Sequence, residues 1–253
     1  AGGKTTASVK IAMELADRDL RVLITTTTKI YEPVTGTDER LLLAQHLEEA
    51  LAGLPGCFRE APIVILARGR TRAEAPQRSW MGPNYPIELH PRKLEGVPPD
   101  WIGAISRAGL ADVIVVEADG AKHRLLKAPN VHEPVVPDCT SLAVPMADVE
   151  VLGKPIDEEH VHRPALLADL AGVPMGCSVS PEVLAIALGH PDGGLKGVPA
   201  QARVIPLLAT RQPDLRCVAT EKAVQMLLLS PRIAYVVQAH LRSTPVRWKV
   251  FTR

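Results

Sequence analysis

The chain has few aromatic residues, no excess of either charge and no long apolar run. Phe, Trp and Tyr make up 3% of its 253 residues, which leaves few surfaces on which nucleic-acid bases could stack. The 29 Lys and Arg residues nearly balance the 28 Asp and Glu residues, which argues against a protein whose main task is to bind nucleic acid or an anionic membrane surface. No apolar run reaches the roughly eighteen residues that cross a bilayer, and no signal-peptide pattern opens the chain. We therefore expect a soluble protein with neither nucleic acid nor membrane as a partner.

Cysteine is also scarce, and its spacing excludes two kinds of scaffold. Cys57, Cys139, Cys177 and Cys217 lie far apart without a Cys-x-x-Cys pair, so neither a cysteine zinc site nor a dense disulfide framework is indicated. Four reduced thiols in a cytoplasmic protein are the expected state. Apolar residues make up 46% of the chain, which suffices for a sizeable core.

Apolar periodicity predicts strands that alternate with helices. Residues 4–19 have the apolar spacing of a helix that packs one face on a sheet, and residues 38–52 predict a second helix capped by Asp38. The strands that we expect are residues 21–26, 62–67, 112–116, 141–145, 203–208, 233–237 and 246–251. The remaining helices are expected near residues 163–171, 181–189 and 220–229.

This alternation predicts an α/β fold with a mostly parallel, doubly wound sheet. Residues 68–100 are rich in Arg, Pro and Gly and have little periodicity, so we expect a long loop or a β-hairpin insertion there. The prediction is one domain over residues 1–253 that carries this insertion.

The first residues have the pattern of a phosphate-binding loop. Gly2 and Gly3 allow backbone N–H groups to curl around phosphate oxygens, and Lys4 is placed to bridge the terminal phosphates of a nucleotide. Thr5 is the predicted Mg²⁺ ligand, with Thr6 behind it, and the helix that follows adds partial positive charge. A chance surface turn is the weaker alternative, because an amphipathic helix and a buried strand follow. The strand and first glycine of such a loop should precede residue 1, so we expect the native chain to begin with a hydrophobic strand that ends in Gly.

Two carboxylates follow the predicted strand at residues 112–116. Open α/β sheets bind ligands at the carboxyl ends of their strands, which is where Glu117 and Asp119 would lie. Either residue could hold Mg²⁺ or orient an attacking water, so both are candidate catalytic and metal-binding residues together with Lys4. The structural alternative, a carboxylate that only caps the next turn, is weaker once the Lys4 loop is considered.

Threonines end the predicted strand at residues 21–26. Their hydroxyls would lie at the same sheet edge, and Thr27 and Thr28 are the preferred candidates for contact with a terminal phosphate or metal. A run of β-branched Thr is equally typical of a plain strand.

Three segments together resemble the YqeC-type family of selenium-dependent hydroxylase accessory proteins. They are Gly2-Gly3-Lys4-Thr5-Thr6, the stretch Val22-Leu23-Ile24-Thr25-Thr26-Thr27-Thr28-Lys29-Ile30-Tyr31, and Glu117-Ala118-Asp119-Gly120-Ala121-Lys122. Later segments also resemble that family: Leu126-Lys127-Ala128-Pro129, His132-Glu133-Pro134-Val135-Val136-Pro137, Leu152-Gly153-Lys154-Pro155 and Val161-His162-Arg163-Pro164.

The resemblance implies a P-loop NTPase-like fold, Mg²⁺ and a nucleoside triphosphate as ligands, and a role in maturing selenium-containing molybdenum hydroxylases. Where such proteins often show an Asn-Lys-x-Asp-like segment, this chain reads Ala209-Thr210-Arg211-Gln212. A guanine-reading Asp is therefore not evident, and ATP and GTP both stay open. Two other functions also stay open, a nucleotide-gated chaperone or binding module with little turnover and a small-molecule kinase.

A basic cluster follows the two carboxylates. Lys122, His123, Arg124 and Lys127 would suit an anionic substrate, a phosphate or an acidic patch of a partner, and a solvated loop with chance charges is an equal alternative.

Overall fold

The computed structural model describes residues 3–33, 38–71, 89–212 and 217–253. These residues group into two compact units. The N-terminal unit comprises Thr5–Gly120 and Val135–Cys139, and the C-terminal unit comprises Ala121–Pro134 and Thr140–Arg253 together with Gly3 and Lys4. Each unit has a sheet and a buried apolar core of its own. The single domain expected from the sequence stays a prediction.

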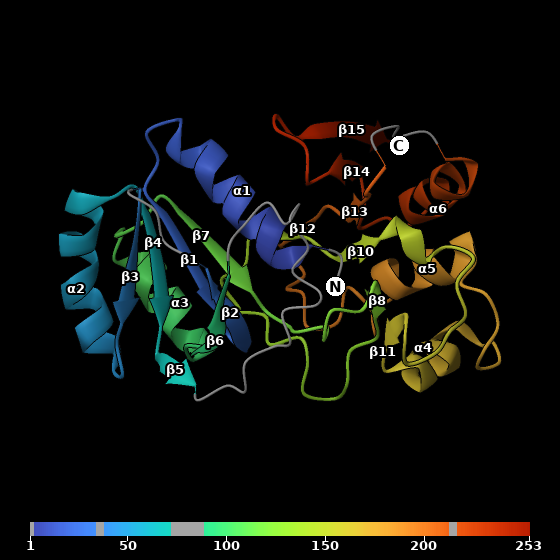
Figure 1. Cartoon of the computed structure of the whole chain (residues 1–253), viewed down its shortest axis with the longest axis horizontal. Helices are drawn as coiled ribbons and strands as arrows, with labels where there is room; N and C mark the ends of the chain where they lie inside the picture. Colours follow the sequence, from blue (N-terminus) through green and yellow to red (C-terminus); the bar gives the residue numbers. More distant parts are fainter. Residues whose placement is uncertain (1–2, 34–37, 72–88, 213–216) are drawn as a thin grey trace. The chain divides into compact units, whose positions relative to one another are not determined.

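A four-stranded parallel sheet lies at the centre of the N-terminal unit (Figure 1). Its strands, in spatial order, are β3 (Glu39–Leu43), β4 (Ile63–Ala67), β1 (Val22–Thr26) and β7 (Val113–Glu117). The register of β1 and β7 places Thr26 opposite Glu117, so the carboxyl ends of these two strands meet at one sheet edge. The predicted strands at residues 21–26, 62–67 and 112–116 are confirmed, and so is their parallel arrangement.

Helices cover both faces of this sheet (Figure 1). On one face, Val9 of α1 (Lys4–Ala16) packs in the same cluster as Val22 and Ile24. On the other face, α2 (Leu47–Glu60) and α3 (Pro99–Arg107) pack around Leu23. Because neighbouring residues of a strand point to opposite faces, the apolar run of β1 supplies both cores at once. The sheet is therefore wound on both faces, as predicted.

The predicted helix at residues 38–52 is wrong in its first half. Glu39–Leu43 forms β3, which pairs in parallel with β4, and α2 begins only at Leu47. Three successive leucines fit an amphipathic helix and a strand equally well, and pairing with β4 decides between the two because it satisfies the strand's backbone groups. The start of α2 is fixed by Glu49, whose carboxylate accepts a hydrogen bond from the backbone N–H of Gln45 at 2.8 Å.

An antiparallel sheet accounts for the described part of the predicted insertion. β5 (Gly69–Thr71) pairs with β6 (Leu89–Glu95), which matches the expected β-hairpin arrangement, while residues 72–88 lie outside the described residues. The sequence did not predict the third strand, β2 (Lys29–Pro33), which also pairs with β6. It also did not predict α3, whose start falls inside the 68–100 range.

The C-terminal unit has its own four-stranded sheet. The strands, in spatial order, are β10 (Met146–Asp148), β13 (Leu207–Ala209), β14 (Tyr235–His240) and β15 (Arg247–Thr252). The first three run parallel, and β15 runs antiparallel to β14. Two short parallel pairs accompany this sheet: β8 (Leu126–Lys127) with β11 (Val161–His162), and β9 (Leu142–Ala143) with β12 (Arg203–Val204).

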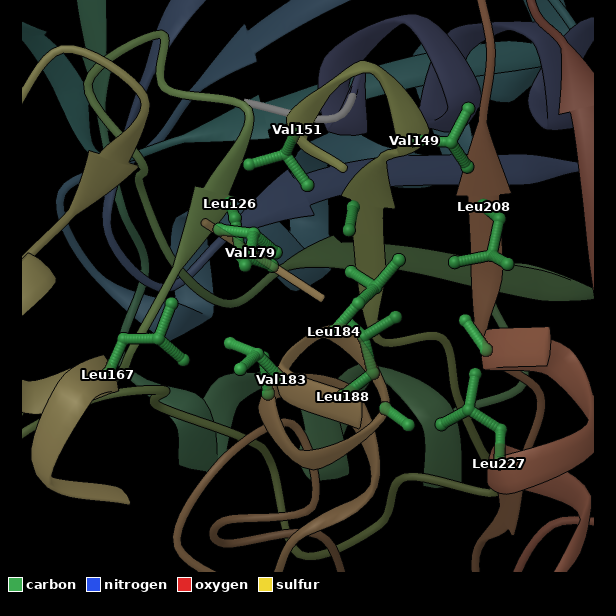
Figure 2. Packing of buried hydrophobic residues seen from close by; sticks show 14 of the residues in the cluster. Leu126, Val149, Val151, Leu167, Val179, Val183, Leu184, Leu188, Leu208 and Leu227 are labelled. Atoms are coloured by element: carbon green, nitrogen blue, oxygen red, sulfur yellow. The ribbon is translucent and has the colours of Figure 1, made fainter. Parts of the chain in front are cut away.

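Three helices and a 3-10 turn complete the C-terminal unit. They are η2 (Val149–Val151), α4 (Pro164–Ala171), α5 (Pro181–Gly189) and α6 (Val218–Leu228). Figure 2 shows leucines and valines from these helices interleaved with Leu208 of the sheet, which forms a continuous apolar core. The helices predicted near residues 163–171, 181–189 and 220–229 are confirmed. Among the described residues, no helix combines the length and the apolar character that crossing a membrane requires.

Candidate functional site

The first turn of α1 meets the end of β7 through a side-chain hydrogen bond. Thr5 is the second residue of α1 and Glu117 is the last residue of β7. The Thr5 hydroxyl donates to Glu117 Oε2 at 2.9 Å, and both residues are half-buried. The contact joins positions 112 residues apart, so the structure brings together two motifs that the sequence predicted separately.

The residues beside Thr5 have distinct environments. Lys4 is the first residue of α1 and is half-buried, whereas Thr6 is only 5% exposed. Gly3 has a φ of +76°, a conformation that side-chain-bearing residues rarely adopt, and a Cβ there would lie 3.0 Å from Leu241 Cδ1. Gly2, predicted to join this loop, lies outside the described residues. A helix leaves its first N–H groups without partners inside the helix, so the start of α1 carries the donors that a phosphate needs.

Hydrogen bonds from the end of β1 hold the Glu117 backbone in place. The Thr26 hydroxyl donates to the Glu117 carbonyl at 2.8 Å, and the Thr27 N–H donates to the same oxygen at 3.3 Å. The Thr26 oxygen also accepts the Thr28 N–H at 3.0 Å. Thr26 is fully buried, so its hydroxyl positions the carboxylate of Glu117 indirectly, through the backbone.

The two threonines that the sequence favoured are half-buried at this edge. The Thr27 hydroxyl donates to the Val135 carbonyl at 2.7 Å, so its proton is used and only its lone pairs remain for a ligand. Thr28 Oγ1 lies 3.3 Å from Thr26 Oγ1. Their proposed contact with a phosphate or metal stays a prediction.

Gly96 is a residue that sequence reasoning missed. A Cβ on Gly96 would lie 2.4 Å from the Thr28 carbonyl oxygen and 2.6 Å from the Thr28 nitrogen, distances that real Cβ atoms do not show. The next residue, Val97, donates its N–H to the Thr26 carbonyl at 2.8 Å. The threonine segment therefore needs glycine at position 96. A single glycine 68 residues after Thr28 gives no indication of this in the sequence.

Asp119, the second predicted carboxylate, lies in the loop after β7 and is half-buried. This loop is anchored where the Val135 N–H donates to the Ala118 carbonyl at 3.1 Å. Glu117, the other predicted carboxylate, contacts Thr5.

The Thr5–Glu117 pair offers two oxygens at a spacing that a magnesium ion could accept, which is also the spacing of an ordinary hydrogen bond. Two neighbouring oxygens around an octahedral Mg²⁺ lie about 2.9 Å apart, because each Mg–O bond is about 2.0–2.1 Å long. Thr5 Oγ1 and Glu117 Oε2 have this separation. In the described part of the chain, no group of three or more His, Cys, Asp and Glu residues could hold a metal. A magnesium here would therefore use few protein ligands and take its others from phosphate and water, which is usual for Mg²⁺.

The predicted basic cluster lies in the C-terminal unit, and one of its members is internally paired. The side chain of Lys127 is 6% exposed and donates to Glu133 Oε2, which also accepts a hydrogen bond from Arg163 Nη1 at 2.8 Å. Lys122 and His123 are exposed and have positive φ angles of 44° and 62°. Lys127 is thus a structural ion-pair partner, whereas Lys122 and His123 remain at the surface.

The same charges act on His162, the partner of Lys127 in the β8–β11 register. Burial and the positive charges of Arg163, Lys127 and Lys122 together lower the pKa of His162 to about 4, against the smaller opposing effect of Glu133. His162 is therefore neutral at physiological pH.

Comparison with known proteins places these motifs in a family. Residues 1–165 match the family described as YqeC protein. Over 207 residues the sequence is 30% identical to the uncharacterized protein YqeC of Escherichia coli strain K12, and the match covers 80% of this chain and 70% of that protein. No solved structure matches the chain. The Thr5 loop, the threonine segment and the Glu117 strand all fall within the matched range.

Proposed function

The chain belongs to the YqeC family, and on that premise we propose that it is a P-loop nucleotide-binding protein that hydrolyses a nucleoside triphosphate with Mg²⁺. The observation that carries this proposal is the 2.9 Å hydrogen bond from the Thr5 hydroxyl to Glu117 Oε2. A threonine at a helix start and a carboxylate at a strand end are the two protein groups that a phosphate-bound magnesium requires in P-loop proteins.

Four of the predicted residues have a specific role in this proposal. Lys4 neutralises the terminal phosphates, Thr5 and Glu117 hold Mg²⁺, and Asp119 orients the attacking water. The start of α1 supplies backbone N–H groups and partial positive charge for the phosphate oxygens. When bound, Mg²⁺ would neutralise charge that develops on the phosphates.

We also propose a client for this activity. The family resemblance supports a role as an accessory factor in the maturation of selenium-dependent molybdenum hydroxylases, with nucleotide turnover driving a loading or folding step. This part rests on the resemblance alone. Capture of such a hydroxylase that depends on bound nucleotide would support it, and capture that is indifferent to nucleotide would contradict the coupling.

Phosphate release from ATP and from GTP tests the enzymatic proposal. Using the full-length protein, we expect Mg²⁺-dependent release that falls about a hundredfold in Lys4→Ala, because one preorganised charged contact contributes this much to a phosphoryl transition state. Lys10→Ala is the matched control, since Lys10 lies on the same helix two turns beyond the loop. Comparison of the two nucleotides identifies the base.

The other outcomes separate the alternative functions. Release that is unchanged in Lys4→Ala would reject the site. Nucleotide binding with negligible release would instead favour the nucleotide-gated binding module. A phosphorylated metabolite in place of free phosphate would identify a small-molecule kinase.

A further inference from the structure

β15 is the outermost strand of the four-stranded sheet in the C-terminal unit (Figure 1). It pairs with β14 in a continuous antiparallel register, and no other described strand pairs with its second edge. An outermost strand exposes backbone N–H and C=O groups with which another strand can pair. β15 contains neither Pro nor Gly and its register has no bulge, so its outer edge is suited to accept a further strand.

The hydrogen bonds of β14 show which backbone groups of β15 point outward. The Val237 N–H donates at 2.9 Å to the carbonyl of Pro206, the residue before β13, so the odd-numbered residues of β14 bond toward β13. The even-numbered residues of β14 therefore bond toward β15, where the register pairs them with odd-numbered residues. The N–H and C=O groups that point away from the sheet are consequently those of Trp248, Val250 and Thr252.

The two faces of β15 differ in chemistry. Phe251 packs against the apolar core that includes α6, and Lys249, on the same face, forms an ion pair with a carboxylate of α6 at 3.4 Å. Alternate residues point to the other face. There Trp248 is 63% exposed and Val250 is 43% exposed, and Tyr235 of β14, 47% exposed, lies diagonally across from Val250. One face thus carries exposed apolar side chains and the other carries positive charge.

The charge around β15 has one sign. Residues 242–253 include four positive side chains and no Asp or Glu; the four are Arg242, Arg247, Lys249 and Arg253. Two copies of the chain paired through β15 would double this positive charge along one short interface, which destabilises the pairing. An acidic strand would be attracted to the same edge. The charge therefore disfavours a second copy and favours an acidic partner.

We propose that β15 binds an extended acidic segment of a partner protein, which adds to the sheet as a further strand. Side chains alternate in both strands, so the segment carries apolar residues next to Trp248 and Val250 and carries Asp or Glu next to Arg247 and Lys249. The outward backbone groups hold the segment, and the alternating side chains select it. β15 belongs to the C-terminal unit, so this surface does not depend on the proposed phosphate loop.

A dye-labelled peptide of four Val-Glu repeats tests the proposal by fluorescence polarisation with the full-length protein. We expect saturable binding of this peptide and about tenfold weaker binding of a peptide of four Val-Lys repeats, because lysines would face Arg247 and Lys249. Arg247→Glu should weaken binding of the acidic peptide and strengthen binding of the basic one. Arg242→Glu, the same charge change in the turn before β15, is the matched control and should leave the preference between the peptides unchanged.

Val250→Pro tests the backbone contact separately. Proline removes the outward N–H of Val250, which makes no bond to β14, so the variant should fold, as a melting curve will show, and should bind the acidic peptide about tenfold more weakly. Val250→Thr keeps the N–H and the branched side chain, and it should bind with nearly the parent affinity. Trp248→Ala keeps the backbone and should also weaken binding about tenfold, because it removes an exposed aromatic contact.

The proposal is overturned if the acidic peptide shows no saturable binding, if the basic peptide binds equally well, or if Val250→Pro and Trp248→Ala both keep the parent affinity. A dimer of the parent protein that Val250→Pro converts to a monomer would also overturn it, because a second copy would then occupy the edge. Lys4→Ala should leave peptide binding unaffected. A failure here therefore stays distinguishable from a failure of the phosphate-loop proposal, which is read from phosphate release.

Discussion

The strand-end site of the N-terminal unit and a cavity of about 630 Å³ in the C-terminal unit are built in opposite ways. In the first, buried polar groups are satisfied: the Thr26 hydroxyl donates to the Glu117 carbonyl and accepts the Thr28 N–H. In the second, the buried Gln238 has an acceptor without a partner among the described residues. The first site is thus held in shape by the protein itself, whereas the second leaves a buried acceptor unsatisfied by the residues that the structure describes.

The two sites also differ in how their residues are distributed along the sequence. The strand-end site is composed of a few short motifs, whereas the cavity is lined by several segments spread between Val149 and Gln238. We expect substitutions at the first site to disturb local geometry strongly, and substitutions at the second to have smaller effects or even to stabilise the protein.

The largest effect is expected at Gly96. Gly96→Ala forces a Cβ within 2.4 Å of the Thr28 carbonyl, so the threonine segment must move, at a cost of about 3 kcal/mol in unfolding free energy. Denaturant unfolding measures this loss. Gly56→Ala is the control, because its Cβ meets only Arg59 at 3.7 Å inside α2 and should stabilise by about 0.5 kcal/mol. Equal stability of the two variants would contradict the packing of the threonine segment.

Glu133 tests how much the ion pairs of the C-terminal unit contribute to its stability, compared with the threonine segment of the N-terminal unit. Glu133→Gln removes the carboxylate charge that Lys127 and Arg163 share and should cost about 2 kcal/mol, less than for a fully buried pair because solvent screens the partly exposed carboxylate. Burial raises the pKa of Glu133, but hydrogen bonds from Arg163 and Lys127 outweigh it and lower the pKa overall. The stabilisation is therefore present above pH 4.5, the ordinary pKa, and is lost as the pH falls below it.

Thermal unfolding of Glu133→Gln at neutral and acidic pH checks both statements. The exposed Glu182–Lys222 ion pair, at 2.7 Å, provides the control, and Glu182→Gln should leave the melting temperature nearly unchanged. A Glu133 variant as stable as this control would show that the buried cluster contributes nothing.

Two substitutions with opposite expected effects on stability test the difference between the satisfied and the unsatisfied buried group. Thr26→Val removes a satisfied hydroxyl and should cost about 1.5 kcal/mol, since the Thr28 N–H and the Glu117 carbonyl lose a partner. Gln238→Met removes an unsatisfied acceptor and should stabilise the protein by about 1 kcal/mol. Denaturant unfolding measures the free energy of unfolding of both variants. A loss of stability in Gln238→Met would indicate that this side chain has a hydrogen-bond partner and would contradict the prediction.

The smallest effect at neutral pH is expected at His162, whose contribution changes only under acidic conditions. Its pKa is lowered from 6.5 to about 4, so the unfolded chain takes up a proton in this window while the folded protein does not. Stability should therefore fall as the pH decreases from 6.5 toward 4, and His162→Gln should remove this part of the pH dependence. Melting temperatures of the parent protein and of His162→Gln between pH 4 and pH 6.5 measure this pH dependence. The exposed His132→Gln serves as the control, and parallel pH profiles for the two variants would be inconsistent with a shielded His162.

The sequence predicted what contiguous patterns encode. The buried strand at residues 112–116 and the helix after Lys4 were placed correctly, because an apolar run and a helical spacing depend on near neighbours. The sequence predicts that Thr5 and a carboxylate serve the same ion, but only the structure shows that Glu117, left open beside Asp119, contacts Thr5. Helices α4 and α5 were equally clear, each with a proline in its first turn.

Contacts between distant residues were not predictable. The sequence predicts helix for Glu39–Leu43, whereas pairing with β4, and not local spacing, makes this segment strand β3. Position 96 requires glycine only because it lies against the Thr28 backbone. In the sequence Gln238 is an ordinary strand residue, and only the structure shows that its buried oxygen has no donor among the described residues. Such features depend on tertiary packing, which a single sequence does not display.

The central claim is that Thr5 and Glu117 act together on one magnesium-bound nucleotide. Nucleotide affinity with and without Mg²⁺ in Thr5→Val, Glu117→Gln and the double variant tests this most directly. We expect Mg²⁺ to strengthen binding in the parent protein, each single variant to remove most of that gain, and the double variant to be no worse than either single one, as for two ligands of the same ion. A Mg²⁺ effect that survives in both single variants, or losses that simply add, would contradict the claim.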